Sequence, residues 1–311
     1  MSKQKKEGFI KQHIVPQSYL NGFASVEKKK SQHKIGVLHK SGKCFCASTK
    51  DVGFIKNYYD DKKLPDIKHW EHYYCNEIEA SCIKTIRKLI AKVTLSNFGH
   101  VSITESEKYN LSRFIIAQFT RVPQFIDHQI TIAKSDLIPS FKRKILRRYG
   151  RFLSNEKREV VNGFGFTDDE LKNIVLTNIN DRTKNDSYCR DLTKKIWILY
   201  INKVYRCFPF ITSDNPIVMY NVLKKSFSRS DNGIGNDNSI IYVPLCPYLA
   251  IGIYPEGYRF SLNANDCKEV ILDENDFGFI FKMANCEIEQ CYQHAFIPLF
   301  FYKEIVEEGK K

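Results

Sequence analysis

The alternation of apolar and polar residues predicts short strands toward both ends of the chain. Near the amino end, "KIGVLHK" and "KCFCAS" are joined at Ser41-Gly42, a dipeptide typical of hairpin turns. Toward the carboxyl end, "FPFITSD", "SIIYVPL" and "LAIGIYP" are strand-like runs bounded by Pro, Gly and Asn. Between the first two of these lies "SRSDNGIGNDNS", whose glycine and asparagine content predicts a mobile loop.

The central part of the chain has the period of amphipathic helices. In "HYYCNEIEASCIKTIRKLIAKV", apolar residues recur at the spacing of one helical face. A second helix is expected to begin at Thr104, which forms a capping box with Glu107, and to be interrupted near Pro123. Three more helices are expected at residues 168–178, 188–201 and 274–293.

Helices in the middle and strands at both ends predict an α+β fold. Its mixed or antiparallel sheet would combine the amino-terminal hairpin with the carboxyl-terminal strands. We expect one domain over residues 12–300, between a basic tail at residues 1–11 and a charged tail at residues 301–311. The 311 residues are 43% apolar and include 22 Phe and 17 Tyr, which suffices for a packed core.

Three of the predicted helices turn polar residues toward their apolar faces. Glu79 borders the apolar face of the first helix, Gln118 and Arg121 lie on that of the second, and Asn285 follows Phe281 by four residues in the last. Burying such groups without partners would cost several kcal/mol, so they normally meet one another or a ligand. The pattern therefore predicts one shared polar centre.

Loop residues are expected to complete this polar centre. They are His13 and Gln17, near the amino end, and the segment "SDNP" at residues 213–216, which ends a predicted strand. The predicted site residues are thus His13, Gln17, Glu79, Gln118, Arg121, Asp214 and Asn215.

Two interpretations fit the polar centre. In the catalytic one, His13 is a general base or metal ligand, and Glu79 and Asp214 are metal ligands or acid–base partners. Arg121 and Gln118 then hold a phosphate or a developing oxyanion. In the structural one, Arg121 pairs with Glu79 or Asp214, and the amide side chains cap loop backbone.

The formal charge of +13 indicates which kind of partner the protein binds. An excess of Lys and Arg raises the affinity for phosphate backbones through counterion release. The charge concentrates in residues 134–158, where Phe141, Ile145 and Tyr149 share one helical face and the cations point elsewhere. The candidate nucleic-acid contacts are Lys142, Arg143, Lys144, Arg147, Arg148 and Arg151.

Other motifs offer competing chemistry. "HIVP" resembles the first histidine of an HNH nuclease, and "RVPQFIDH" has the Arg and His spacing of HEPN ribonucleases. His33, His39, Cys44 and Cys46 are four conceivable zinc ligands on one hairpin, although an incidental grouping is the simpler interpretation. The sequence has no P-loop, no G-x-G-x-x-G and no G-x-S-x-G, which disfavours nucleotide-driven motors, dinucleotide oxidoreductases and α/β-hydrolases.

The same polar residues carry a family resemblance. "QHIVPQSYLNGF", "IAQFTRVP", "FITSDNPIV" followed by "VPLCP", and "MANCEIEQCYQHAF" together resemble the bacterial domain-of-unknown-function family 4238, from His13 to about Phe296. The resemblance implies one signature and no particular reaction, and Cys246 stands where the family has a small hydroxyl residue. The implied signature residues are His13, Pro16, Gln17, Glu79, Gln118, Arg121, Pro123, Ser213, Asp214, Asn215 and Pro216.

These observations favour a nucleic-acid-acting hydrolase, of the nuclease-effector type found in bacterial or phage conflict, with Mg²⁺ or Mn²⁺ as the metal if one is used. A non-enzymatic module that binds nucleic acid or protein is the alternative, and a hydrolase or transferase acting on a nucleotide or small phosphorylated metabolite is a third. No run is long enough to span a membrane and no signal peptide is evident, so we expect a cytoplasmic protein. The ten cysteines are expected to be reduced, and a homo-oligomer is compatible with the sequence.

Overall fold

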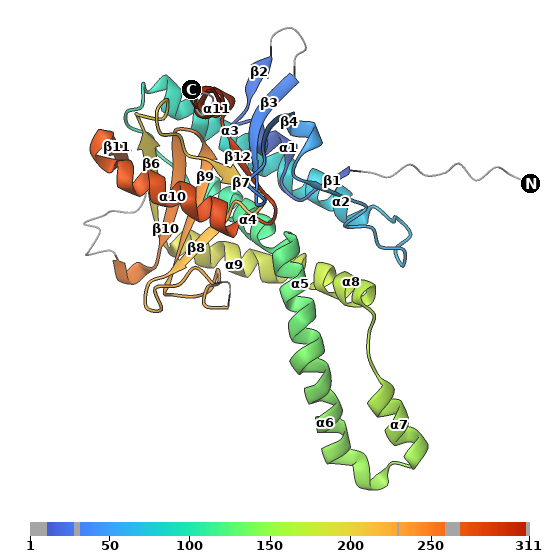
Figure 1. The fold of residues 1–311 in the computed structure, drawn as a ribbon. Coiled ribbons are helices and arrows are strands. Elements are labelled where there is room, and N and C mark those ends of the chain that lie inside the picture. Colours follow the sequence, from blue (N-terminus) through green and yellow to red (C-terminus); the bar gives the residue numbers. More distant parts are fainter. Residues whose placement is uncertain (1–10, 28–31, 229, 259–267, 309–311) are drawn as a thin grey trace, which may run out of the picture. The chain divides into compact units, whose positions relative to one another are not determined.

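The chain divides into two compact units. The structure is a computed structural model that describes residues 11–27, 32–228, 230–258 and 268–308. The first unit comprises Met1–Phe119 and Arg182–Lys311, and the second comprises Thr120–Asp181 (Figure 1). The domain predicted over residues 12–300 therefore corresponds to two units. Of the predicted basic tail, only Lys11 lies within the described residues.

One sheet of the first unit joins segments from both ends of the chain. Its strands run in the order β2 (Ser25–Glu27), β3 (Gln32–His39), β12 (His294–Ile297) and β7 (Thr212–Ser213), and β4 (Cys44–Ser48) also pairs with β3. The β3–β4 turn is the predicted one, because Gly42 adopts a φ of 83°, which favours glycine. The predicted sheet, built from the amino-terminal hairpin and carboxyl-terminal strands, is confirmed, as is the α+β class.

A second, larger sheet is mixed. It runs in the order β11 (Lys268–Leu272), β6 (Ile196–Asn202), β10 (Leu249–Tyr254), β9 (Ser239–Cys246) and β8 (Val218–Asn221). Only the β11–β6 pair in it is parallel, among the residues that the structure describes. A third, two-stranded sheet pairs β1 (Lys11–His13) with β5 (Phe54–Lys56).

The prediction of a helix over residues 188–201 is wrong in its second half, which forms a strand. Helix α9 spans Arg182–Lys194, and the chain then enters strand β6, all of whose residues are buried. A continuous apolar run such as "IWILYIN" shows neither the 3.6-residue repeat of an amphipathic helix nor the two-residue alternation of a half-buried strand. Periodicity alone therefore does not distinguish a buried strand from a buried helix. Pairing with β10 on one side and β11 on the other decides for the strand.

The helices of the first unit begin largely where local signals predict. After α1 (Gln17–Leu20) and η1 (Thr49–Asp51), α2 (His69–Tyr73) leads through a π-helical segment, η2 (Tyr74–Glu79), into α3 (Ala80–Leu95). The apolar residues that recur in this segment at the spacing of one helical face are all buried: Ile78, Cys82, Ile86, Leu89 and Val93. Helix α4 (Glu105–Thr120) has the predicted capping box, in which the Glu107 amide donates to Thr104 Oγ1 at 3.2 Å and the Thr104 amide to Glu107 Oε2 at 2.9 Å.

Helices near the carboxyl end connect the two larger sheets. After η5 (Glu256–Tyr258) and η6 (Glu274–Asp276), α10 (Phe277–Gln290) contacts β8 of the larger sheet and β7 and β12 of the other. Helix α11 (Leu299–Glu308) packs on β3, where a Cβ on Gly36 would lie 2.6 Å from Tyr302 Cβ. Most of the predicted charged tail is therefore helical.

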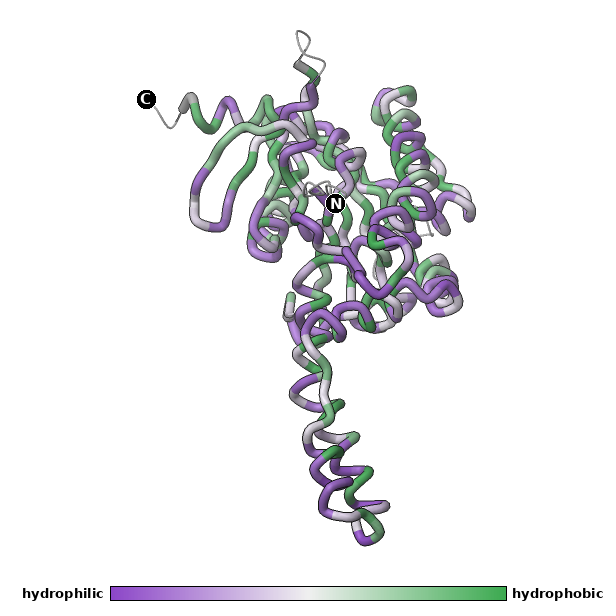
Figure 2. The backbone as a smooth tube through the Cα atoms, turned by 90° about the vertical axis from the view of Figure 1, so that its right-hand side faces the viewer, coloured by the Kyte–Doolittle hydropathy of each residue, from purple (hydrophilic) through white to green (hydrophobic). Residues whose placement is uncertain are grey.

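The second unit is helical throughout its described elements. They are α5 (Pro123–Ile132), the π-helical η3 (Ala133–Leu137), α6 (Ile138–Tyr149), η4 (Gly150–Phe152), α7 (Asn155–Gly163) and α8 (Asp168–Ile179). Helix α5 packs on α8 and α6 on α7. Figure 2 shows hydrophilic and hydrophobic residues interspersed along these helices.

Candidate functional site

Asp214 is held by backbone amides. Its side chain is buried directly after β7, where it accepts hydrogen bonds from the amides of Tyr292 at 2.6 Å, Gln293 at 2.8 Å and His294 at 2.9 Å. His294 Nδ1 also lies 3.7 Å from Asp214 Oδ2. Both carboxylate oxygens are thus used to fix the segment between α10 and β12, and a metal ion would have to compete with these amides.

The residues on either side of Asp214 bind helix α10. Ser213 Oγ donates to Glu287 Oε2 at 2.6 Å and accepts from the Asn215 amide at 3.1 Å. Asn215 Nδ2 donates to the Gln290 carbonyl at 2.8 Å. The predicted "SDNP" segment therefore does gather polar groups, and its described contacts are with the last turns of α10 and with the segment that follows this helix.

Glu287 is the buried acid of this cluster. Burial raises its pKa to about 8; the Ser213 hydroxyl opposes this rise, and the nearby Asp214 charge adds to it. Among the described residues, no hydrogen-bond partner lies within reach of Glu287 Oε1. The carboxyl is therefore mostly protonated at neutral pH, which makes it a proton donor in the interior.

Tyr19 connects this cluster to the amino-terminal segment. From helix α1, its hydroxyl lies 3.0 Å from Thr212 Oγ1 and donates to the Pro244 carbonyl at 2.5 Å. Its ring packs on Phe114 of α4 with centroids 5.3 Å apart. Burial, followed by the charge of Glu287, raises the Tyr19 pKa well above its usual value, so the phenol stays neutral.

Gln118 joins α4 to the segment that carries His13. It is buried, as predicted, and its Nε2 donates to the Ile14 carbonyl at 2.7 Å. His13 itself is half-buried on β1, with its ring against Phe54 at a centroid distance of 6.1 Å. Gln17 is half-buried at the first position of α1.

The remaining predicted residues lie elsewhere in the chain. Glu79 is half-buried at the end of η2, where its charge raises the pKa of Cys75 after the larger effect of burial. Arg121 is buried at the start of the second unit. The described contacts thus place Gln118 beside the segment of His13, Asn215 against the end of α10, and Asp214 against the segment that follows α10.

Glu287 was missed by the sequence analysis, which selected Asn285 on the same helix. Asn285 is only half-buried. Glu287 follows the buried Met283 by four residues and Ile280 by seven, the spacing of one helical face. That spacing was the signal available in the sequence.

Most of the chain matches one protein family. Residues 11–296 match the model of the family described as "Protein of unknown function (DUF4238)". The chain belongs to the DUF4238 family. No curated protein and no solved structure matches it.

The zinc alternative fails in this DUF4238 chain because of strand register. Cys44 pairs with Leu38 and Cys46 with Gly36, so both cysteines lie on the face of the even-numbered β3 residues. His33 and His39 belong to the opposite face. Over the described part of the chain, no three His, Cys, Asp or Glu side chains are grouped closely enough to hold a metal ion.

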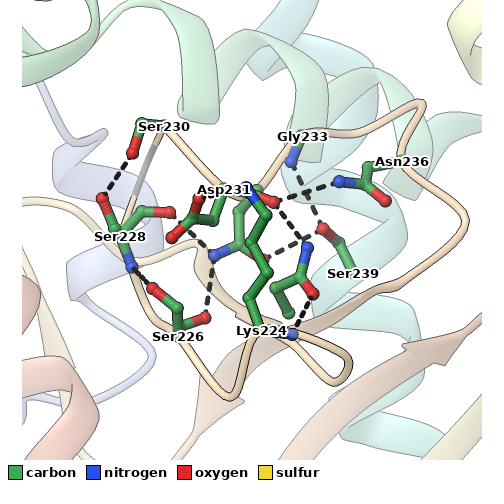
Figure 3. Close-up of polar contacts among 10 residues, drawn as sticks. Lys224, Ser226, Ser228, Ser230, Asp231, Gly233, Asn236 and Ser239 are labelled. Carbon is green, nitrogen blue, oxygen red and sulfur yellow. Dashed lines mark hydrogen bonds and ion pairs between the residues drawn. The ribbon is translucent and has the colours of Figure 1, made fainter.

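The loop predicted to be mobile is extensively hydrogen-bonded. Asn221 and Asn236 both donate to the Asp231 carbonyl, at 2.6 and 3.0 Å, and Lys224 Nζ lies 2.6 Å from Asp231 Oδ1 (Figure 3). Lys195, buried next to β6, donates to the Ile234 carbonyl at 3.2 Å. Side-chain amides thus add to the backbone hydrogen bonds of this polar segment, such as that from the Asn236 amide to the Gly233 carbonyl at 3.0 Å.

The six candidate nucleic-acid contacts lie in the second unit of this DUF4238 chain. Five of them are exposed on α6 and η4, and Lys142 is half-buried with its Nζ donating to the Asn162 carbonyl at 2.5 Å. Arg143 donates to Ser140 Oγ at 2.8 Å, and the Arg148 guanidinium lies 5.4 Å from the Tyr149 ring centroid.

Within the described residues, no helix is long and apolar enough to cross a membrane.

Proposed function

We propose that this DUF4238 protein is a cytoplasmic nucleic-acid-binding protein whose second unit contacts the phosphate backbone. The observation that supports this most is the charge of α6 and η4. Between Asp136 and Glu156 the chain has six cations and no acidic residue. We call the exposed cations of this stretch, Arg143, Lys144, Arg147, Arg148 and Arg151, the cationic face.

The acidic residues of the same unit leave this cationic face uncompensated. Asp168 pairs with Lys134, and Asp169 Oδ1 lies 4.0 Å from Lys172 Nζ. Among the residues that the structure describes, no acidic side chain pairs with Lys144, Arg147 or Arg151. A group of cations that is not neutralised internally attracts a polyanion and releases its counterions.

Helical spacing keeps these side chains together. Residues 143 and 147, and residues 144 and 148, are each four positions apart, so these side chains project from one side of α6. Arginine predominates among them, and its planar guanidinium binds phosphate oxygens in a bidentate manner. The arrangement supports contact with several consecutive phosphates and gives no basis for reading a base sequence.

Equilibrium binding tests the proposal. Fluorescence anisotropy of labelled 20-nucleotide single strands and duplexes would be measured with the wild type and with Arg147→Gln/Arg148→Gln. We expect binding that weakens about tenfold or more in this variant at low salt. The control is Lys84→Gln/Arg87→Gln on exposed positions of α3, which removes the same charge and should change affinity little. Equal losses of affinity in Arg147→Gln/Arg148→Gln and in the control variant would contradict the proposal.

Hydrolysis of the bound nucleic acid is a second candidate. The observation behind it is that the bond from Gln118 to the Ile14 carbonyl brings α4 next to the residue that follows His13; a bond from this amide to the backbone is also what the structural interpretation of the polar centre expects. In this candidate His13 is the general base, and Mg²⁺ or Mn²⁺ is the metal if one is used.

A cleavage assay separates hydrolysis from binding alone. End-labelled tRNA, single-stranded DNA and duplex DNA would be incubated with Mg²⁺, Mn²⁺ or EDTA. Cleavage by the wild type and none by His13→Ala, with both proteins binding equally, would support a nuclease. Intact substrates in every lane, with binding retained, would leave a binding protein. Competition by excess mononucleotide tests the smaller phosphorylated ligands.

A further inference from the structure

An apolar cavity of about 260 Å³ lies beside helix α10 in the first unit. Its floor is made by the buried side chains of Ile211, Ile280 and Ile297. Its volume is slightly below the range of typical ligand pockets of proteins, about 300–1,000 Å³. That size suits a small molecule and is too small for a peptide helix.

Aromatic rings form one wall of this cavity. Phe208, Phe277 and Phe281 line it and are 40%, 44% and 55% exposed. Phe208 packs edge-on against Phe277 with centroids 4.9 Å apart, and Phe277 stacks with Phe281 at 5.8 Å. Exposed aromatic side chains gathered around one cavity are a feature of binding sites, because a bound ligand would remove their apolar surface from water.

Asn285 is the polar residue of the cavity lining. No charged side chain lines the cavity among the described residues. The amide of Asn285 makes no hydrogen bond within the described part of the chain, so it is available to a ligand. A lining with no charge disfavours phosphates and carboxylates, which would lose their hydration without gaining a cation.

We propose that this cavity binds a neutral aromatic molecule of one or two rings that carries one hydrogen-bonding group. The ring stacks on the wall formed by Phe208, Phe277 and Phe281. Its polar group bonds the Asn285 amide. This site is separate from the cationic face and does not depend on the proposed nucleic-acid binding.

Two isosteric probes test the ring and the hydrogen bond separately. Indole carries an N–H donor, and benzothiophene has the same shape without it. Titration calorimetry or saturation-transfer NMR with the full-length protein is expected to show saturable binding of both, with indole the tighter by about three- to tenfold. Asn285→Leu should abolish this preference while retaining binding of benzothiophene.

Variants of the cavity wall locate the site. Ala284→Trp, which fills the cavity, is expected to weaken both probes by at least tenfold. Phe281→Ala removes a mostly exposed ring and should weaken them about threefold or more with an unchanged melting temperature. Leu95→Trp, at a position 85% exposed on α3, is the control and should bind normally.

Three results of these binding experiments would overturn the proposal. The proposal is overturned if neither probe binds the wild type up to its solubility limit, or if Phe281→Ala and Ala284→Trp bind as the wild type does. Binding of 1-decanol without binding of either ring compound would also overturn it, because the site would then be aliphatic.

Discussion

Ser213 Oγ donates a 2.6 Å hydrogen bond to Glu287 Oε2, and this contact joins strand β7 to helix α10 in the interior of the first unit. A charged carboxylate with one hydrogen bond at this depth would be costly. The raised pKa of Glu287, about 8, follows from that cost. The acid is protonated in the folded protein at pH values where the unfolded chain has lost the proton.

Glu287 therefore makes stability fall as pH rises. Its contribution is fully present below its usual pKa of 4.5 and is lost as the pH rises through about 8. We expect the wild type to lose on the order of 3 kcal/mol from this group between pH 5 and 8. Glu287→Gln cannot ionise and should lack this part of the pH dependence.

Urea unfolding at several pH values measures this effect. The difference in unfolding free energy between the wild type and Glu287→Gln should change steadily from pH 5 to pH 8. Glu289→Gln, at an exposed position of the same helix, should track the wild type. Parallel curves for the wild type and Glu287→Gln would show that Glu287 is ionised at neutral pH in the folded protein.

Asp214 is expected to stabilise the fold. Asp214→Ala leaves the amides of residues 292–294 without their acceptor, and we expect a loss of roughly 2 to 4 kcal/mol in chemical denaturation. Asp191→Ala, an exposed control whose partner Lys194 lies at 3.8 Å, should cost less than about 0.5 kcal/mol. An unchanged stability for Asp214→Ala would remove the structural role assigned to this residue.

Glu107 gives the opposite pH dependence. Burial raises the pKa of Glu107. The hydrogen bonds from the Thr104 amide and from the lysines at positions 92 and 88 outweigh this effect and lower the pKa to about 2. Its contribution is therefore present above the usual pKa of 4.5 and is lost as the pH falls toward 2. Glu107→Gln should cost about 1 to 2 kcal/mol at pH 7, a modest value because Lys88 is largely exposed.

Acid unfolding tests this prediction. The stability gap between the wild type and Glu107→Gln should narrow below pH 4 and close near pH 2. Glu304→Gln, at an exposed position of α11, serves as the control. A gap that persists at pH 2 would mean that the carboxylate charge is not what stabilises the start of α4.

The packing of α11 on β3 requires a glycine. A Cβ at position 36 would lie 2.6 Å from Tyr302 Cβ and 2.7 Å from Cγ, atoms close to the helix backbone that move little. Gly36→Ala should therefore destabilise the protein by about 1 to 3 kcal/mol. The double variant Gly36→Ala/Tyr302→Ala should lose somewhat less than the sum of the two single variants, because the close contacts with the ring atoms Cγ and Cδ2 are removed while the contact with Cβ remains. Additive losses in thermal or urea unfolding would argue against this contact.

Local signals in the sequence predicted much of the fold. The Thr104 capping box and the Ser41-Gly42 turn depend on residues three or fewer positions apart, and both are present in the structure. Strand β6 was predicted as a helix because its identity depends on pairing with β10 and β11, which come at least 47 residues later in sequence. Sequence periodicity contains no information on such partners.

The spacing of polar residues on predicted helices gave a mixed result. Gln118 is buried as its helical position indicates, whereas Asn285, selected because it follows Phe281 by four residues, is half-buried, and the buried polar residue of that helix is Glu287. The zinc alternative on the hairpin failed because ligands must share a face, and the β3–β4 register places the cysteines and histidines on opposite faces. Roles for His13, Gln17, Glu79 and Arg121 stay predictions that the cleavage assay addresses.

The salt dependence of nucleic-acid binding tests the central claim most directly. For a duplex, the slope of log affinity against log salt decreases in magnitude by about 0.9 for each phosphate contact that is lost. We predict that Arg147→Gln/Arg148→Gln lowers the slope by about 2, and that Lys84→Gln/Arg87→Gln leaves it unchanged. Equal slopes for the wild type and Arg147→Gln/Arg148→Gln would contradict the assignment of the cationic face as the phosphate-binding surface.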